Sequence, residues 1–387
     1  MRIYRLAILS PISKHGIIHD MTSQKPNNFL SINLGAIAEN FGILQKTVGP
    51  HCQVGAVVKA DCYRLGADRI VPVLEQAGCD FFYVGSPDEA LFVRTLTDKP
   101  IGMLNGPSQG REDALIAANI MPVLQSLADI ESWLSRDAPA MIHFDTGMNR
   151  LGLRADETAI LCDRIATDPA YQAFAMRVPI IMSHLACGDD VDDSLNKDQR
   201  ERFAAIADHF PAAQKSLANS FGIFCGDDFH FNQVRPGMAL YGLNPQPGYD
   251  NPMTPVVSYH ARILQIATAQ PDETAGYGAT HAFSRETLTA TIATGYKDGF
   301  LRTLGNSGAV YINGHACPIV GRISMDLTII DIGHLRKIGD DAMPSVGDYA
   351  ELLGPHQSAD TLALAAGTIG YEILTALGNG SPKIYID

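Results

Sequence analysis

Short apolar runs alternate with amphipathic stretches at a regular spacing from about residue 29 to residue 243. The amphipathic stretches, such as 68–76 and 88–95, have the periodicity of helices, and the apolar runs have the length of buried strands. Repeated βα units favour a parallel sheet, and about eight strands over roughly 215 residues match a (β/α)8 barrel of the TIM type. A doubly wound sheet is the alternative that spacing alone leaves open. The expected strands are residues 30–34, 54–59, 81–84, 101–104, 123–125, 141–145, 180–184 and 229–235.

The pattern changes after residue 244, where β-branched runs follow one another without long helices between them. Asn313-Gly314 separates two of these runs, and this dipeptide suits the two positive-φ positions of a type I′ hairpin turn. We therefore expect an α/β chain in which a (β/α)8 barrel is followed by a mostly-β domain. The expected division is an N-terminal extension at 1–28, the barrel at 29–245 and the β domain at 246–387.

The charge and the cysteine content exclude several classes of partner. Acidic residues outnumber basic ones by 42 to 29, for a net charge of -13, and no basic cluster offers a footprint for nucleic acid or an anionic membrane. The seven cysteines are scattered without a Cys-x-x-Cys pair, which predicts no disulfide framework, no metal site and a reducing cytoplasm. No stretch reaches the ~18 apolar residues of a membrane span.

The first 27 residues lack clear periodicity. Pro11 and His15 interrupt the apolar run after the basic start too early for a secretory signal. The segment is interpreted either as a poorly ordered extension or as the result of an upstream start codon, with Met21 as the alternative first residue.

Residues 54–59 form an apolar run that ends in a lysine. Barrel enzymes carry their active sites at the C-terminal ends of the strands. An amine removed from water at such an end has its charged form disfavoured, so its pKa falls and it becomes a good nucleophile for forming a Schiff base. A lysine that only extends from the strand end into solvent is the alternative that this segment alone leaves open. The polar residues at expected strand ends are Lys59, Asp145, His184 and Arg235.

The segment Ala56-Val-Val-Lys59-Ala-Asp-Cys-Tyr63 resembles the signature of the alanine racemase family of fold-type III pyridoxal-phosphate enzymes, which is close to A-V-V-K-A-[ND]-A-Y-G-x-G. Further segments resemble parts of the same family and occur in its order, from about residue 29 to the C-terminus. Each short string is weak alone, but the shared order across both expected domains is specific. These segments are 145–152, 183–186, 219–220, 234–242, 276–280, 295–299, 321–326 and 371–372.

The resemblance implies a racemase that uses pyridoxal phosphate, acts on alanine and forms a homodimer with shared active sites. Lys59 would bind the cofactor as a Schiff base and move the Cα proton on one face. Tyr277 of the partner subunit would do the same on the other face, because inversion of a stereocentre needs proton transfer on opposite sides. His184 and Arg235 would form a relay that helps the phenol act as a base. Arg235 would also face the pyridine nitrogen, where a guanidinium cannot accept a proton, so that the electron sink is weaker and transamination is limited.

The same resemblance implies three further groups of residues around the cofactor and the substrate. The phosphate would be held by Tyr63, Ser220, Tyr371 and the backbone N–H groups of Gly237 and Met238. The substrate carboxylate would be oriented by the forked donors of Arg150 and by the backbone of Met325. A narrow polar access corridor would be formed by Asp189, Tyr296, Arg302 and Arg322.

Several positions depart from the family pattern. Arg64 stands where glycine is usual after the phosphate tyrosine, and Asp61 and Leu65 replace the more frequent asparagine and histidine. We expect a turn of different backbone shape or an added surface charge, which puts cofactor affinity in doubt. His143 lies where some members carry a lysine, modified by carbon dioxide, that braces the carboxylate-binding arginine, so that His143 would have to hold Arg150 instead.

Other functions share parts of this pattern. A racemase of broader specificity, acting on serine, lysine or arginine, would share the fold and both bases, but the string at 148–152 and the narrow corridor favour alanine. A non-catalytic pyridoxal-phosphate-binding barrel protein would end after the barrel and lack Tyr277. A decarboxylase of this fold would place a carboxylate where Arg235 stands. Ser216 replaces a histidine often found beside that arginine, which predicts weaker tuning of Arg235. The metabolic role, either D-alanine supply for peptidoglycan precursors or alanine catabolism, stays open.

Overall fold

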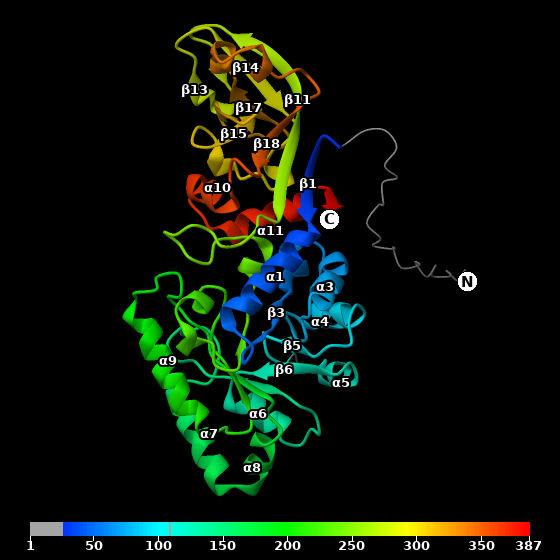
Figure 1. Ribbon diagram of the computed structural model, residues 1–387, viewed down its shortest axis with the longest axis vertical. Coiled ribbons are helices and arrows are strands. Elements are labelled where there is room, and N and C mark those ends of the chain that lie inside the picture. The colour runs from blue at the N-terminus through cyan, green and yellow to red at the C-terminus, as the bar shows by residue number, and fades with distance from the viewer. Residues whose placement is uncertain (1–25, 108–109) are drawn as a thin grey trace, which may run out of the picture.

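A closed parallel sheet forms one end of the molecule, and a mostly antiparallel β domain forms the other (Figure 1). The computed structural model describes residues 26–107 and 110–387, so residues 1–25 of the expected extension lie outside the described part. In order around the parallel sheet, the segments are β2 (Gln53–Val54), β10 (Gln233–Val234), β9 (Gln214–Ser216), β8 (Ile180–Met182), β7 (Met141–His143), β6 (Ile120–Leu124), β5 (Ile101–Met103), β4 (Phe82–Val84) and β3 (Ala56–Val57).

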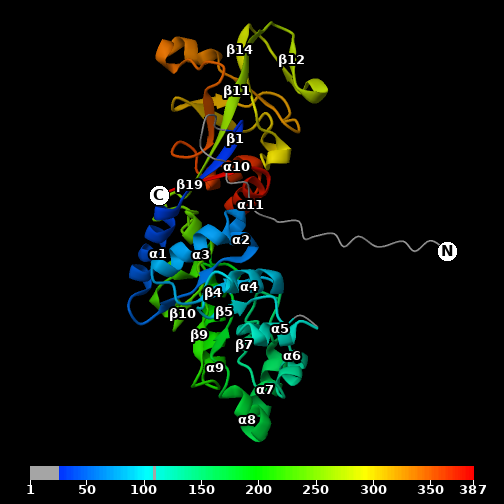
Figure 2. The same cartoon turned by 90° about the vertical axis from the view of Figure 1, so that its right-hand side faces the viewer.

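The barrel closes because β2 and β3 are two segments of one strand, interrupted at Gly55. The nine segments of the sheet therefore make eight strands, which confirms the predicted (β/α)8 barrel and excludes the doubly wound sheet. Helices surround this sheet on the outside (Figure 2). They are α1 (Leu34–Val48), α3 (Ala67–Gln76), α4 (Pro87–Arg94), α5 (Glu112–Ala117), α6 (Leu127–Trp133), α7 (Ala155–Thr167), α8 (Pro169–Ala175) and α9 (Ser194–Ala207).

Two barrel strands differ from their predicted form. β9 lies in the polar stretch Gln214-Lys-Ser216, of which only Ser216 is buried, so no apolar run marks it in the sequence. The run expected at 229–235 is a strand only at β10, because Phe229 ends a short 3-10 helix and residues 230–232 form a turn.

The expectation that residues 30–34 form the first barrel strand is wrong. β1 (Asn28–Asn33) pairs antiparallel with β11 (Val257–Ala269) and parallel with β19 (Lys383–Ile386), which places it in the sheet of the β domain. The apolar residues of β1 are buried there, and such a run can satisfy either sheet because its pairing partners are remote in sequence. Asn33 then accepts a hydrogen bond from the backbone N–H of the third following residue at 2.8 Å, which caps α1 and leads the chain into the barrel.

The β domain is built on the long strand β11. Its other main strands are β14 (Thr287–Ile292), β15 (Ala309–Ile312), β16 (His315–Pro318), β17 (Thr328–Asp331) and β18 (Tyr349–Leu353), and a separate small hairpin pairs β12 (Thr274–Ala275) with β13 (His281–Ala282). The hairpin predicted at Asn313-Gly314 is confirmed, since these two residues join β15 to β16 with φ angles of 48° and 82°.

Two helices lie between the β domain and the barrel, α10 (Ala359–Ala366) and α11 (Gly370–Gly380) (Figure 1). α11 packs against the segment that follows β3 and so forms one wall above the barrel. Among the described helices, none taken singly has the length and apolar content of a membrane span; α10 and α11 reach that measure only as a pair bent by 99°.

The inside of the barrel is filled by buried side chains from alternating positions of its strands. A filled interior leaves the C-terminal strand ends as the place where a ligand can bind. The filling residues are Val57, Phe81, Tyr83, Met121, Val123, Met141, Ile180 and Met182.

Candidate active site

Lys59 stands at the start of a left-handed turn. It follows β3 and begins α2 (Lys59–Arg64), in which residues 60–64 all have positive φ, between 52° and 66°. None of these five residues is glycine, and a side chain in this conformation costs about 1–2 kcal/mol. Burial of Cys62 and Tyr63 helps to offset that cost. Strain of this kind persists where the surroundings over-determine the backbone, which is common at functional sites.

Three of the departures from the family pattern lie in or directly after this turn and have separate effects. Asp61 is not an added surface charge, because its Oδ1 accepts a hydrogen bond from Ala67 N at 2.7 Å and caps the start of α3. Leu65 is fully buried in the main hydrophobic core. Arg64 is exposed and has a φ of 66°, where glycine would carry no strain.

Glu89 ties the turn to the neighbouring strand end. It lies three residues after Ser86, the N-cap of α4, in the Ser-x-x-Glu pattern of a capping box. Its carboxylate accepts hydrogen bonds from Ala60 N at 3.1 Å and Gly85 N at 2.8 Å, and so bridges the segments that follow β3 and β4. The sequence prediction missed this residue, although the capping-box spacing after an expected strand was a usable signal.

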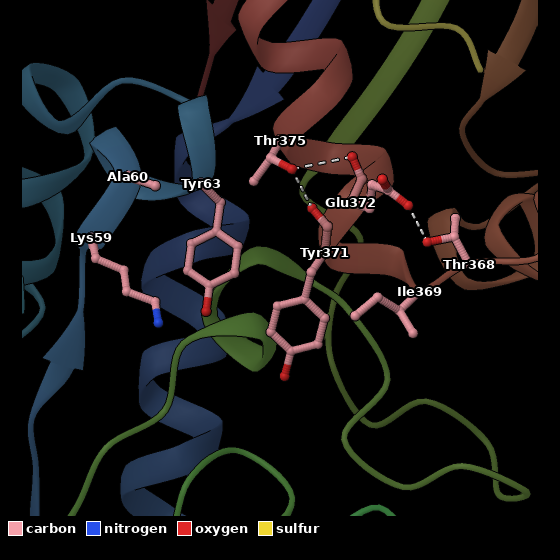
Figure 3. Close-up of a pocket in the computed structure, with 8 residues that line it drawn as sticks. All are labelled: Lys59, Ala60, Tyr63, Thr368, Ile369, Tyr371, Glu372 and Thr375. Atoms are coloured by element: carbon pink, nitrogen blue, oxygen red, sulfur yellow. Dashed lines mark hydrogen bonds between the residues drawn. The ribbon is translucent and has the colours of Figure 1, made fainter. Parts of the chain in front are cut away.

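Lys59, Tyr63 and Tyr371 meet at one cavity of about 440 Å³. Figure 3 shows the Lys59 amine and the hydroxyls of both tyrosines directed toward the same side. Burial lowers the pKa of Lys59, and the charge of Arg150 lowers it further, while Glu89 opposes both. More of the amine is therefore uncharged at neutral pH than in a free lysine, which makes it a better nucleophile. The cavity is also lined by Ala60, Thr368, Ile369, Glu372 and Thr375.

Arg235 and His184, predicted to form a relay, lie next to each other. Arg235 is 4% exposed; its Nη1 donates to Ser216 Oγ and its Nη2 donates to the Ser183 carbonyl, both at 2.5 Å. Nη2 also lies 3.5 Å from His184 Nδ1, and His184 Nε2 lies 3.4 Å from Asn219 Nδ2. Burial, and then the charge of Arg235, holds the pKa of His184 well below its usual range, so the imidazole is neutral. A neutral ring can accept from the guanidinium at one nitrogen.

A set of neutral donors lies between the ends of the first and last barrel strands. Ser220 Oγ accepts hydrogen bonds from Gly237 N at 3.0 Å and Ala239 N at 3.3 Å, where a short 3-10 helix begins at Met238. Gly237 abuts the Tyr63 hydroxyl so closely that a Cβ atom would collide with it. Hydroxyl and amide donors arranged around a glycine fit the phosphate of pyridoxal phosphate, because the backbone can approach the anion closely.

Arg150 lies within electrostatic reach of the lysine. It is exposed, and its charge lowers the pKa of Lys59, His143 and His184. Asp145 orders its loop by accepting two backbone N–H bonds at 3.0 Å. Burial lowers the pKa of His143 to about 4, so this residue is neutral at pH 7 and is no charged substitute for the modified lysine.

The remaining predicted residues gather on the β domain. Tyr277 lies between β12 and β13 and is 73% exposed, and a Cβ on the following glycine would come within 2.7 Å of Arg322 Nη1. Met325 and Tyr296 are 53% and 44% exposed and belong to neighbouring loops, which the backbone bond from Lys297 N to the Met325 carbonyl joins. Arg302 is exposed on the same domain.

The predicted residues form two groups. The barrel group comprises Lys59, Tyr63, Arg150, His184, Ser220, Arg235, Gly237, Met238 and, from α11, Tyr371. The β-domain group comprises Tyr277, Tyr296, Arg302, Arg322 and Met325. Asp189 belongs to the barrel group, since its charge adds to burial in raising the pKa of Tyr371. None of Tyr277, Met325 and Tyr296 is among the residues that line the cavity, and Figure 2 shows β12 at the end of the β domain away from the barrel. Within residues 26–107 and 110–387, no group of three or more His, Cys, Asp or Glu side chains could hold a metal ion.

Comparison with known proteins agrees with this two-part arrangement. The family described as alanine racemase, N-terminal domain, matches residues 32–245, and the alanine racemase C-terminal domain matches residues 256–385. Alanine racemase of Rhodospirillum rubrum is 42% identical over 364 residues, which cover 92% of this chain and 95% of that protein. The catabolic alanine racemase of Rhizobium johnstonii is 41% identical over 371 residues, 94% of this chain and 96% of that one. The crystal structure of alanine racemase from Bartonella henselae with covalently bound pyridoxal phosphate superposes with a TM-score of 0.87 at 38% identity, over 94% of this chain and 100% of that one.

Proposed function

The chain belongs to the alanine racemase family and is a pyridoxal-phosphate-dependent alanine racemase, and we propose that Lys59 and Tyr277 exchange the Cα proton of alanine on opposite faces of the bound cofactor. The observation that carries the proposal is the placement of Lys59, whose lowered pKa and strand-end position open onto the same cavity as Tyr63 and Tyr371. When bound, pyridoxal phosphate supplies a carbonyl that reacts with amines and an electron sink for the substrate Cα.

The barrel group would hold the cofactor. Lys59 would bind it covalently, and Arg235 would meet its pyridine nitrogen with a charged group that cannot take the ring proton. The phosphate would be held by Tyr63, Ser220, Tyr371 and the backbone N–H groups of Gly237 and Met238. We propose on this basis that residues 29–245 supply most of the cofactor-binding residues and that residues 246–387 supply Tyr371, on α11, and the second base, although β1 pairs with the β domain.

The β-domain group would act in a second copy of the chain. Tyr277 does not line the cavity of its own chain, and Tyr277, Met325 and Tyr296 are 73%, 53% and 44% exposed, so a second protomer would cover these side chains. We propose a homodimer in which Tyr277 of the partner subunit is the second base. The neutral imidazole of His184 beside Arg235 would then provide a hydrogen bond that eases loss of the phenol proton.

Substrate recognition would combine both groups. Arg150 of the barrel and the backbone of Met325 would hold the alanine carboxylate, and the exposed charge of Arg150 close to Lys59 supports this placement. The access corridor would be lined by Asp189, Tyr296, Arg302 and Arg322.

A mixed dimer tests the shared site. Lys59→Ala and Tyr277→Phe chains carrying different tags are co-expressed, and the doubly tagged heterodimer is purified. One of its two sites would carry neither change, so it should recover about half of the wild-type alanine racemisation, while each variant homodimer is inactive. If each site were built within one chain, every site of the heterodimer would carry a lesion, and the activity would not recover.

For the cell, we propose a cytoplasmic enzyme that supplies D-alanine for peptidoglycan precursors. All seven cysteines are free thiols, which supports a reducing compartment. Rescue of a D-alanine-requiring bacterial strain by this chain, and failure of the Lys59→Ala variant to rescue it, would support the biosynthetic role. Turnover of serine, lysine or arginine at rates close to that of alanine would instead point to the broader racemase.

A further inference from the structure

Arg235 is held inside the barrel by a hydroxyl whose direction is fully determined. Its Nη1 lies 2.5 Å from Ser216 Oγ, and Ser216 Oγ lies 2.6 Å from the carbonyl oxygen of Gln233. A carbonyl can only accept, so the single proton of the serine hydroxyl goes to Gln233 and the serine lone pairs face the guanidinium. Ser216 and Gln233 have no exposed surface, which keeps water out of this contact.

The side chain of Gln233 is held as firmly as its backbone. Tyr83 donates its hydroxyl proton to Gln233 Oε1, and Gln233 Nε2 donates to Gln53 Oε1 at 2.7 Å. Burial raises the pKa of Tyr83 and the nearby charge of Arg235 opposes that rise, so the Tyr83 hydroxyl also lies within electrostatic reach of Arg235. The contacts form one hydrogen-bonded network inside the barrel, buried at Arg235, Ser216, Gln233 and Tyr83 and partly buried at Gln53, and networks of this kind add rigidity.

The strands are shaped to accept this network. A Cβ atom at Gly55 would lie 2.7 Å from Tyr83 Cε2, and a Cβ at Gly102 would lie 2.8 Å from Tyr83 Cε1. The two glycines therefore leave the space in which the Tyr83 ring crosses between neighbouring strands. The support behind Arg235 is built from several strands and does not depend on one contact.

We propose that Ser216 is a positioning residue for Arg235, held in place by Gln233 and Tyr83. This hydrogen-bond network would set the contact of Arg235 with the cofactor ring nitrogen. The inference rests on the proposed function, because it needs Arg235 to face that nitrogen. The bonds of Nη1 and Nη2 to Ser216 and to the Ser183 carbonyl fix the plane of the guanidinium. A serine hydroxyl does not ionise in the working pH range, so Ser216 adds no second charge beside Arg235.

The test compares three variants of the full-length protein. Ser216→Ala removes the acceptor, Ser216→Thr keeps a hydroxyl on a residue that suits a strand, and Thr158→Val removes a buried hydroxyl on α7 that bonds only to the Leu153 carbonyl, 3.4 Å away. Apo-protein is titrated with pyridoxal phosphate, and the absorbance band of the bound cofactor is recorded. We expect Ser216→Ala to weaken cofactor binding about tenfold and to shift the band, because a buried Nη1 donor loses its partner. Ser216→Thr should stay within about threefold of wild type, and Thr158→Val should equal it.

A second readout follows the side reaction that Arg235 limits. In an abortive turnover, one alanine, one water and one pyridoxal phosphate bound to Lys59 would become one pyruvate, one pyridoxamine phosphate and the free Lys59 amine, so that the amino group moves from substrate to cofactor. Ser216→Ala should give more pyruvate per racemisation than wild type, and Ser216→Thr should restore the wild-type ratio. Unchanged cofactor affinity, spectrum and pyruvate ratio in Ser216→Ala would overturn the proposal.

Tyr83→Phe keeps the proposal testable if Ser216→Ala does not fold, since it removes only the hydroxyl behind Gln233. We expect about threefold weaker cofactor binding and a shift of the absorbance band smaller than that of Ser216→Ala. A wild-type result would count against the role of the Ser216 network. Wild-type protein is assayed first for stoichiometric cofactor uptake and for alanine racemisation. Wild-type protein that neither takes up the cofactor nor racemises alanine would contradict the proposed function. Active wild-type protein together with an unchanged Ser216→Ala variant would contradict only the positioning role of Ser216.

Discussion

The barrel and the β domain carry their functional residues in opposite ways. In the barrel, Arg235 and Ser216 are buried, and Nη1 and Nη2 of the guanidinium each donate to one acceptor at 2.5 Å. On the β domain, Tyr277 and Met325 are 73% and 53% exposed, and they belong to loops between short strands. The barrel group is therefore complete in one chain, while the β-domain group faces outward.

Under the proposed function, this difference separates cofactor binding from catalysis. Residues organised within the barrel would bind pyridoxal phosphate in every chain, whether or not a partner is present. A base on an exposed loop can act only after a second surface has covered it. Changes in the barrel group should therefore affect cofactor uptake, and changes in the β-domain group should affect turnover alone.

The largest effect is expected from Lys59→Ala. The variant lacks the amine that we propose binds the cofactor and handles one proton, so racemisation should fall by at least about 10⁴-fold. Borohydride treatment followed by peptide mapping should attach reduced cofactor to Lys59 in the wild type and to no peptide in the variant. Reduced cofactor on another lysine would break the assignment of the barrel group.

The next effect is expected from Tyr277→Phe. Loss of the phenol should lower racemisation by about 10²–10⁴-fold and leave cofactor uptake within the error of the wild-type titration. Tyr249→Phe is the matched control, since Tyr249 is another tyrosine with 68% exposure and lies outside both groups. A loss of cofactor affinity in Tyr277→Phe as large as its loss of turnover would remove the distinction between the two regions.

The sequence was sufficient for the barrel but not for the pairing of every strand. Apolar runs of three to seven residues in βα order predicted the closed parallel sheet, and Asn313-Gly314 predicted a hairpin that the structure confirms. The run at 30–34 was assigned to the wrong sheet because an apolar strand carries no label for its partners. β9 was missed because its residues are mostly polar and its pairing comes from the backbone.

The candidate site shows a similar limit. The adjacency of His184 and Arg235 followed from the resemblance and agrees with the observed contact. The left-handed turn at 60–64 was not predictable, since it contains none of the glycines that normally mark positive φ. Ser216 was expected beside Arg235 from the resemblance, and it lies there as a hydrogen-bond acceptor. Tyr83 was missed, because side chains that meet inside a barrel are far apart in sequence.

The charges of Glu89 and Arg150 shift the pKa of Lys59 in opposite directions, and removing each charge tests this part of the barrel group. In the proposed function, capture of pyridoxal phosphate by apo-protein needs the uncharged Lys59 amine, so the capture rate should rise with pH through the Lys59 pKa and then level off. Burial lowers this pKa and the Glu89 carboxylate raises it, so Glu89→Gln should move the midpoint to lower pH, by about half to one unit. Arg150→Gln removes a charge that lowers the same pKa and should move the midpoint to higher pH. Stopped-flow absorbance measures both, and shifts in the same direction would show a change of shape instead of charge.

The smallest expected effect concerns the strain under Lys59. Arg64 is exposed with a φ of 66°, so Arg64→Gly should relieve about 1–2 kcal/mol of strain, while the added freedom of glycine in the unfolded chain costs about 0.5–1 kcal/mol. The balance is a gain of about 0.5–1 kcal/mol in unfolding free energy, measured by urea denaturation with the cofactor saturating. Gln45→Gly, at an exposed position of the right-handed helix α1, should instead lose up to about 1 kcal/mol. Equal losses of unfolding free energy in Arg64→Gly and Gln45→Gly would mean that the turn holds Arg64 without strain. The barrel group would then be ordered by its packing alone.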